Sequence, residues 1–231
     1  KEDETIVNFL AIKDFDNSEE FLVFGTAHGR VKRTAVKEYR NVNVSGIHAI
    51  KLGEGDRLIG TVLASGEDDV VLATRQGMSI RFHETDARSM GRIAAGVKGI
   101  ALSDDDEVVG IVRGADDCDL LTVTDRGYGK RTAMSEYLVH LEDGTSRRQK
   151  RGGKGRKDIR TTKRNGEVVA IRSIQERDSL VFVSEQGMMV RIPTDSIRRI
   201  GRNTQGVRLV NLKEGDTLQA AARIADQGDD A

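Results

Sequence analysis

FLVFGTAHGRVKRT (21–34), VVLATRQGMSIRF (70–82), LLTVTDRGYGKRT (120–132) and LVFVSEQGMMVRI (180–192) are four versions of one pattern. Each begins with an apolar run, turns at a glycine and ends in a short run that contains basic residues. The turn glycines are Gly29, Gly77, Gly127 and Gly187, which are 48, 50 and 60 residues apart. Two such runs around a glycine are typical of a β-hairpin. The sequence therefore predicts four related hairpins.

Each copy continues into a connecting segment and a glycine-led apolar stretch. These stretches are SGIHAIKL (45–52), AGVKGIAL (95–102), QGVRLVNL (205–212) and, less cleanly in the third copy, GEVVAIRSI (166–174). Three copies then have an acidic turn and another apolar run, in EGDRLIGTVLA (54–64), DDDEVVGIVRG (104–114) and EGDTLQAAARI (214–224). In the third copy, residues 147–164 interrupt this order and account for the longer spacing.

These runs predict about four short strands in each copy, because they are rich in β-branched residues and separated by turn signals. A four-stranded repeat of roughly 40–50 residues is typical of a propeller blade. Radial stacking of blades buries both sheet faces and protects the strand edges. The apolar fraction of 37% favours several small cores over one thick core. We therefore predict an all-β, propeller-like array of four-stranded blades, with about four blades visible.

The repeats also set the expected boundaries. We expect blades at 20–65, 69–113, 119–175 and 179–225, the third of them with a basic insertion, and an acidic tail at 226–231. Residues 1–15 resemble the closing strand of a preceding blade, so we interpret the chain as a fragment of a longer array.

The charge of the chain is strongly segregated although its net value is zero. Residues 147–164 contain ten basic residues and one acid, Asp158, whereas the rest of the chain has an acidic excess. Such segregation favours a polyanionic partner. Three glycines in RRQKRGGKGRKD (147–158) allow a backbone to approach phosphates closely. No aromatic residue is interleaved, which favours a duplex backbone over stacked single-stranded bases.

The candidate DNA-binding residues fall into two groups. The first is the basic segment: Arg147, Arg148, Gln149, Lys150, Arg151, Gly152, Gly153, Lys154, Gly155, Arg156 and Lys157. The second follows the turn glycines or lies in a connecting segment: Arg30, Lys32, Arg33, Arg81, Lys130, Arg131, Arg191 and Arg202. Because the second group recurs from copy to copy, we expect it to line one rim of the array. Arg88, Arg92, Arg198 and Arg199 would extend that rim.

No set of residues suggests catalysis or metal binding. The histidines are dispersed, no metal-ligand spacing occurs, and the single cysteine, Cys118, rules out an intramolecular disulfide. A single cysteine fits a reducing cytoplasm. We expect a non-catalytic chain that needs no cofactor. A propeller that docks an acidic protein through the basic segment is the alternative from another functional class.

The repeats and the basic segment closely resemble the C-terminal domain of the DNA gyrase A protein. The hallmark of that family, the GyrA box, reads Gln, Arg or Lys, Arg, Gly, Gly, Arg or Lys, Gly, and residues 149–155 match all seven positions. RGYGKRTAMSEY (126–137) and IGRNTQGVRLV (200–210) are also similar to the closing blades of the family. The related domain of topoisomerase IV is the nearest alternative, and the box favours gyrase.

The resemblance implies a β-pinwheel, in which neighbouring blades exchange a strand and DNA wraps around the outer rim. It also implies a role in ATP-dependent negative supercoiling, with the rest of the gyrase A protein and the gyrase B protein as partners in the bacterial cytoplasm, associated with the nucleoid. ATP and magnesium would be used elsewhere in that enzyme. The family's box normally lies in the first blade, whereas in this chain it lies in the third visible repeat. Residues 149–155 are therefore either the principal or an auxiliary wrapping element.

Overall fold

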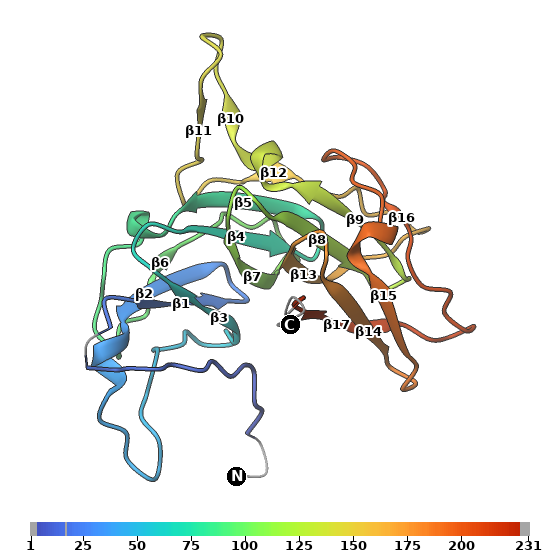
Figure 1. The fold of residues 1–231 in the computed structure, drawn as a ribbon. Helices are drawn as coiled ribbons and strands as arrows, with labels where there is room; N and C mark the ends of the chain where they lie inside the picture. Colours follow the sequence, from blue (N-terminus) through green and yellow to red (C-terminus); the bar gives the residue numbers. More distant parts are fainter. Residues whose placement is uncertain (1–3, 17, 227–231) are drawn as a thin grey trace, which may run out of the picture.

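A computed structural model describes residues 4–16 and 18–226 and contains four antiparallel sheets side by side in an arc (Figure 1). The first three sheets have four strands each and the last has three. A separate hairpin of two short strands, β10 (Val139–His140) and β11 (Ser146–Arg147), projects away from the arc (Figure 1). The all-β class and the blade-like repetition are confirmed.

The strands of each sheet follow one another from the inside of the arc outward. The first sheet contains β3 (Leu58–Ala64), β1 (Phe21–Thr26), β2 (Arg30–Ala35) and β6 (Val97–Lys98). The second contains β7 (Val108–Gly114), β4 (Asp69–Thr74), β5 (Met78–His83) and β12 (Arg156–Lys157). The third contains β13 (Val168–Ile174), β8 (Asp119–Thr124), β9 (Tyr128–Ala133) and β16 (Val207–Arg208). The fourth contains β17 (Leu218–Ile224), β14 (Ser179–Ser184) and β15 (Met189–Pro193). Short 3-10 turns follow the second strand of each hairpin: η1 (Val36–Tyr39), η2 (Glu84–Asp86), η3 (Met134–Tyr137) and η4 (Thr194–Ser196).

The four hairpins form where the sequence predicts them. All four turn glycines have a positive φ, which only glycine adopts without strain. A hydroxyl at the end of the first strand also closes the turn in three copies. Thr26, Thr74 and Ser184 accept a hydrogen bond from the backbone N–H four residues later, at 3.1–3.2 Å. The side chain that precedes each turn therefore stabilises it.

Neighbouring sheets exchange strands, as the resemblance implies. The outer strand of each of the first three sheets comes from the following repeat: β6 pairs with β2, β12 with β5 and β16 with β9. The innermost strands β3, β7, β13 and β17 contact one another in sequence along the inside of the arc. Each sheet is therefore held to the next by backbone hydrogen bonds as well as by packing.

The third copy differs from our prediction. We expected residues 166–174 to supply its glycine-led stretch and residues 147–164 to be an interruption. Instead, Gly155 and β12 take the position that Gly96 and β6 take in the second copy. Residues 168–174 form β13, the innermost strand. The prediction was wrong because an outer-edge strand needs backbone hydrogen bonds rather than apolar side chains, so a charged segment serves equally well.

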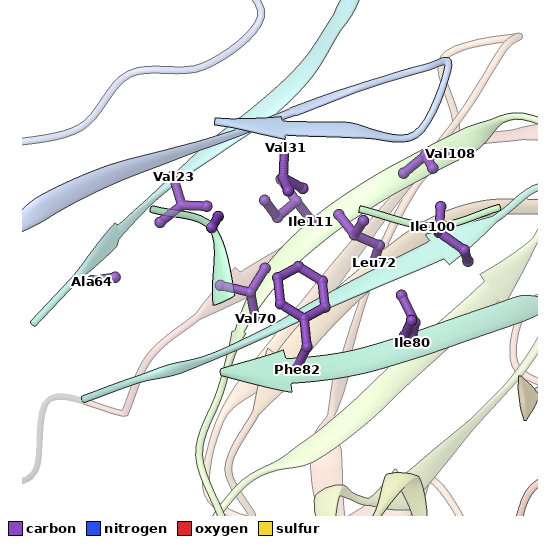
Figure 2. Packing of buried hydrophobic residues seen from close by; sticks show 11 residues of the cluster. Val23, Val31, Ala64, Val70, Leu72, Ile80, Phe82, Ile100, Val108 and Ile111 are labelled. Atoms are coloured by element: carbon purple, nitrogen blue, oxygen red, sulfur yellow. The ribbon is translucent and has the colours of Figure 1, made fainter. Parts of the chain in front are cut away.

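Hydrophobic cores lie between successive sheets. Figure 2 shows the first of these, where Val23 and Val31 of the first sheet meet Val70, Leu72 and Phe82 of the second. Two further clusters join the second sheet to the third and the third to the fourth. Several small shared cores are what the modest apolar content predicts.

The beginning of the chain differs from expectation. Residues 4–15 form no strand, although a closing strand was expected across 1–15; residues 1–3 lie outside the described part. The segment instead runs beside the first sheet, where the Asn8 side-chain amide donates to the Thr61 carbonyl oxygen at 2.8 Å. Of the expected acidic tail at 226–231, only Asp226 is described. No helix in the described residues is long and apolar enough to span a membrane.

Candidate nucleic-acid interface

The basic segment is fixed to the outer edge of the first two sheets through its backbone. The Gln149 N–H donates to the Arg81 carbonyl oxygen at 3.1 Å, and the Gly152 N–H donates to that of Gly99 at 2.6 Å. The Gly153 carbonyl oxygen in turn accepts from the Ala101 N–H at 2.9 Å. The segment is therefore not a free loop, and its side chains project from a defined path.

Gly155 is needed for this path. Its φ is +73°, and a Cβ at this position would lie 2.3 Å from the carbonyl oxygen of Ser79 on β5. By contrast, a Cβ on Gly153 would approach no atom closer than 3.7 Å. Close approach to a phosphate therefore remains available at Gly153, whereas Gly155 serves the contact between strands.

Arg148 joins the second and third repeats. Its guanidinium forms an ion pair with Asp69, which also pairs with Arg81 at 2.6 Å. The next interface repeats the arrangement, because Arg199 pairs with Asp119 at 2.5 Å. Arg148 therefore has a structural counterpart in the following repeat, and its charge is largely neutralised within the protein.

Other residues of the basic segment also bind the protein. Arg151 donates to the carbonyl oxygens of Asp86 at 2.7 Å and Lys98 at 3.0 Å. The Lys157 ammonium donates to the Gln76 carbonyl oxygen at 2.8 Å, and the Gln149 amide to that of Tyr137 at 3.4 Å. Arg156 is half-buried, and its pKa is lowered first by that burial and then by the neighbouring Arg202.

Lys150 and Lys154 are exposed and form no hydrogen bond or ion pair through their side chains within residues 4–16 and 18–226. Arg147 is exposed as well and contacts only the carbonyl oxygen of its neighbour Arg148, at 3.3 Å. These three cations are the part of the basic segment that is free to meet an external anion.

Most of the cations that follow the turn glycines are buried, which corrects the predicted rim. The side chains of Lys32 and Lys130 are fully buried, and Arg81 and Arg33 are 2% and 7% exposed. Arg33 pairs with Glu84 at 2.8 Å, and Lys130 pairs with Asp158 at the same distance. Arg33, Arg81 and Lys130 are thus paired with acids inside the protein, whereas Lys32 donates to the Tyr39 hydroxyl and the Ala49 carbonyl oxygen.

The remaining members of the predicted rim are more accessible. Arg131 is 12% exposed and pairs with Asp119 at 3.8 Å. Arg30 is half-buried and donates to the carbonyl oxygens of Ala95 and Gly96. Arg202 is half-buried, and Arg191 is exposed on the last sheet. Arg33, Arg81, Arg131 and Arg191 occupy the same register position in the four hairpins, but only Arg191 is exposed, so the group forms no exposed rim. Of the connecting-segment arginines, Arg88 and Arg198 are exposed, Arg92 is half-buried and Arg199 is paired with Asp119.

Burial of Lys32 gives a testable pH dependence. Burial, and secondarily Arg92, lowers the pKa of Lys32 from 10.5 to about 8. The folded state therefore binds fewer protons than the unfolded state between these values, so stability should rise with pH there. We expect Lys32→Met to remove this rise in chemical denaturation series from pH 7 to pH 10. An unchanged pH profile would contradict the burial of the charged group.

The exposed cations that do recur lie on the exchanged strands. Lys98 of β6 and Arg208 of β16 are exposed, and Lys157 of β12 is half-buried at the same register position. All three stand two residues after a glycine with positive φ: Gly96, Gly155 and Gly206. Lys98 and Arg208 were not among the predicted DNA-binding residues, although their spacing from the glycine is visible in the sequence.

A second cluster of cations gathers around Tyr128. The hydroxyl of Tyr128 accepts from Arg208 at 2.8 Å and from Arg164 at 3.4 Å. Both guanidinium groups also lie near the tyrosine ring, 5.1 and 5.4 Å from its centroid. The hydrogen bonds from Arg164 and Arg208 lower the pKa of Tyr128. One residue thus holds two cations from different repeats side by side.

Exposed cations lie along the outer edges of the first three sheets, and Arg147 stands beside them on β11, at the base of the projecting hairpin. We call this surface the outer belt: Lys98, Arg147, Lys150, Lys154, Arg160, Lys163, Arg164 and Arg208 are its exposed members. Backbone contacts connect its parts, including the bond from the Arg160 N–H to the Thr204 carbonyl oxygen at 2.7 Å. The only acid between residues 144 and 166 is Asp158, which is buried against Lys130. The stretch from 145 to 165 therefore adds no exposed acid to the belt.

The family model of the DNA gyrase C-terminal domain, a β-propeller, matches residues 20–65, 68–113, 119–140, 147–175 and 178–225. These matches cover all four repeats and include the basic segment. The chain belongs to the DNA gyrase C-terminal domain family. The break in the match at residues 141–146 coincides with the tip of the projecting β10–β11 hairpin, which is thus outside the common pattern of the gyrase C-terminal domain.

Curated gyrase A proteins are similar to nearly the whole chain. The chain is 41% identical over 215 residues to the DNA gyrase A protein of Haloquadratum walsbyi, covering 92% of the chain and 24% of that protein. It is 39% identical over 230 residues to the gyrase A protein of Staphylococcus aureus, covering 99% and 25%. The chain thus spans about a quarter of the length of these relatives.

Two solved structures have the same fold. The C-terminal domain of DNA topoisomerase IV superposes with a TM-score of 0.85 at 24% identity, covering 96% of this chain and 67% of that one. The DNA gyrase A C-terminal domain superposes with a TM-score of 0.79, also at 24% identity, covering 90% and 67%. At this identity the likeness concerns the fold.

Proposed function

We propose that the chain binds and bends double-stranded DNA along the outer belt and catalyses no reaction itself. The observation that carries this proposal is the concentration of exposed cations in the belt, in a chain whose remaining residues have an acidic excess. Arginine and lysine contact phosphate oxygens well, and such contacts position a duplex without reading its sequence. The belt has no exposed aromatic side chains to stack on bases, which favours a duplex over a single strand.

The curvature of the sheet array supports bending. The belt follows the outer edges of three sheets that lie along an arc (Figure 1), so a duplex that contacts all of it must curve. Bending 20–30 base pairs by 40–90° costs about 1–6 kcal/mol, which phosphate contacts along the belt would offset. Each released counterion adds to the favourable free energy of binding.

Within a longer protein, we propose that the chain is the DNA-wrapping domain of a gyrase A protein. There it would support ATP-dependent negative supercoiling together with the rest of the gyrase A protein and the gyrase B protein, in the bacterial cytoplasm and next to the nucleoid. The complete GyrA box at residues 149–155 and the identity to curated gyrase A proteins support gyrase over topoisomerase IV. DNA cleavage and ATP hydrolysis would belong to other parts of that enzyme.

Plasmid topology tests this proposal directly. We expect that ligating a nicked circular plasmid in the presence of the chain, and then removing the protein, shifts the distribution of linking numbers on a gel. The shift arises because the plasmid is ligated while it is bent with one handedness around the belt. Ligation then fixes the changed linking number. A shift that disappears at high salt supports electrostatic wrapping.

The alternatives give different outcomes. Binding without a topological shift would indicate a DNA-binding array that does not wrap, as expected for a topoisomerase IV-like domain. Failure to bind DNA at low salt would overturn the proposal and favour a propeller that docks an acidic protein.

A further inference from the structure

One of the three strand exchanges brings two cations to a single neutral hydroxyl. In each exchange, the residue after a turn glycine faces the residue two positions after the positive-φ glycine of the exchanged strand. The facing pairs are Arg30 and Lys98, Met78 and Lys157, and Tyr128 and Arg208. Arg30 donates to two carbonyl oxygens of the protein, and Lys157 to a third. In the last pair, by contrast, Tyr128 accepts from Arg208 and also from Arg164.

The two cations at Tyr128 have no acidic partner. Arg164 and Arg208 are both exposed, and neither forms an ion pair within residues 4–16 and 18–226. Arg208 has one further contact, with the neutral amide oxygen of Asn211 at 3.5 Å. Two guanidinium groups that share one neutral acceptor repel each other. An anion between them would replace this repulsion with two charge-assisted hydrogen bonds.

The hydroxyl of Tyr128 is arranged as a third donor. A phenol oxygen has two lone pairs and one proton. Arg208 and Arg164 donate to that oxygen at 2.8 and 3.4 Å, and the described residues give the proton no acceptor. Arg164 uses only its Nε for this bond, so both of its terminal amino groups remain available. The hydroxyl and both guanidinium groups can therefore donate to one external oxyanion.

A buried amide holds the two cations in place. Asn165 is fully buried, and its side-chain oxygen accepts from the N–H and the hydroxyl of Thr162, both at 2.8 Å. Its side-chain N–H groups donate to the carbonyl oxygens of Arg160 at 3.0 Å and Gln205 at 3.1 Å. Asn165 therefore ties the loop that carries Arg164 to the segment that leads into β16. This pairing of two repeats fixes the site before any ligand arrives.

We propose that Tyr128, Arg164 and Arg208 form a clamp for one phosphate group, and that a phosphodiester of duplex DNA is its ligand. Arginine pairs bind phosphate oxygens well, and the phenol adds a neutral donor beside them. The inference rests on the proposed DNA binding and gives the outer belt one fixed contact besides its separate cations. Inorganic phosphate presents the same oxygen atoms, so it serves as a second probe of the clamp.

Tyr128→Phe tests the third donor, because it removes a hydroxyl but no charge and keeps the buried ring. We expect the affinity for a short DNA duplex to fall about tenfold, as for the loss of a hydrogen bond to a charged group. The slope of log K against log salt should change little, because both cations remain. Equal affinities of the variant and the wild type would overturn the clamp.

A double-mutant cycle tests whether the two cations share one phosphate. Arg164→Gln and Arg208→Gln together should reduce the salt slope by up to about 0.9, the value for one lost phosphate contact. The affinity loss of the double variant should be smaller than the product of the two single losses. Arg147→Gln with Arg208→Gln is the control pair, because these cations lie on different sheets, and its losses should multiply. Losses that multiply in both pairs would overturn the shared contact.

Carbon-13 labelling of the tyrosine Cζ atoms reports on the clamp directly. The hydrogen bonds from Arg164 and Arg208 lower the pKa of Tyr128. A bound phosphate takes these donors and adds negative charge, so the pKa should rise. We expect inorganic phosphate or a short duplex to shift the Tyr128 signal and move its alkaline titration to higher pH. Sodium chloride at equal ionic strength should do neither, and the signals of the buried Tyr39 and Tyr137 should stay unchanged.

The two probes separate this inference from the proposed function. A response of Tyr128 to both phosphate and duplex supports the clamp and its ligand. Duplex binding without any response of Tyr128 would overturn the clamp and leave DNA binding to the other cations of the belt. A response to phosphate without duplex binding at low salt would overturn DNA as the ligand, and the proposed function with it.

Discussion

Replacing Asp158 with alanine is expected to lower the free energy of unfolding by about 3–5 kcal/mol, because it leaves a buried cation without its partner. Asp158 is 1% exposed, and its carboxylate accepts from the Lys130 ammonium at 2.8 Å. It also accepts from the hydroxyls of Thr122 at 2.6 Å and Tyr137 at 2.5 Å. Burial, followed by the nearby Asp158 carboxylate, raises the pKa of Tyr137 well above its usual value, so Tyr137 remains a donor.

This network has a large effect because of its position. Asp158 immediately follows the exchanged strand β12, whereas Lys130 lies on β9 of the next sheet. The carboxylate therefore connects the basic segment to the third sheet. Its removal takes away the acceptor of the Thr122 and Tyr137 hydroxyls and the counter-charge of Lys130, which keeps only the neutral acceptors Thr132 and Gly201.

Chemical denaturation of Asp158→Ala measures this loss. Glu142→Ala is the control, because Glu142 is an exposed acid at the tip of the projecting hairpin and should change stability by less than about 0.5 kcal/mol. Equal stability losses in the two variants would show that the buried network contributes nothing.

The second large effect concerns DNA binding. Replacing Arg147, Lys150 and Lys154 together with glutamine should weaken DNA binding and reduce its dependence on salt. The slope of log K against log salt should fall in magnitude by up to about 0.9 for each phosphate contact that is lost. These three cations are exposed and make no ion pair within the described residues, so their removal should leave the fold intact.

A triple replacement elsewhere is the control. Lys13, Lys37 and Lys213 are exposed and lie outside the outer belt, so their replacement by glutamine changes the net charge equally. Titrations of a short duplex at several salt concentrations should separate the two variants. If both reduced the slope by the same amount, net charge rather than the belt would explain binding.

The repetition of the sequence was enough to predict the hairpins and the blades. An apolar run that ends at a glycine determines a hairpin through local chemistry, and the same pattern occurred four times. The exchange of strands came from the resemblance, and residues 155–157 were misplaced because β12 has charged side chains. An outer strand forms where a glycine is correctly placed and backbone N–H groups are available for pairing. The hydrophobicity of the segment indicates neither of these.

The candidate site was predicted in part. Lys150 and Lys154 are exposed as expected, and the basic segment lies on the outer edge. Lys130 and Arg33 were misjudged, because their partners Asp158 and Glu84 are 28 and 51 residues away in the chain. A sequence shows where a charge is, but its burial depends on which distant acid the fold brings beside it.

The exchanged strands also determine the order in which the sheets become complete during translation. The edge of β2 becomes complete only when β6 has emerged from the ribosome, and the edge of β5 only after β12. During translation the newest sheet therefore has an unpaired edge strand. A nascent chain on a neighbouring ribosome of the same messenger RNA can pair with this edge before the following repeat is synthesised. Production of this fold depends on how quickly the following repeat arrives.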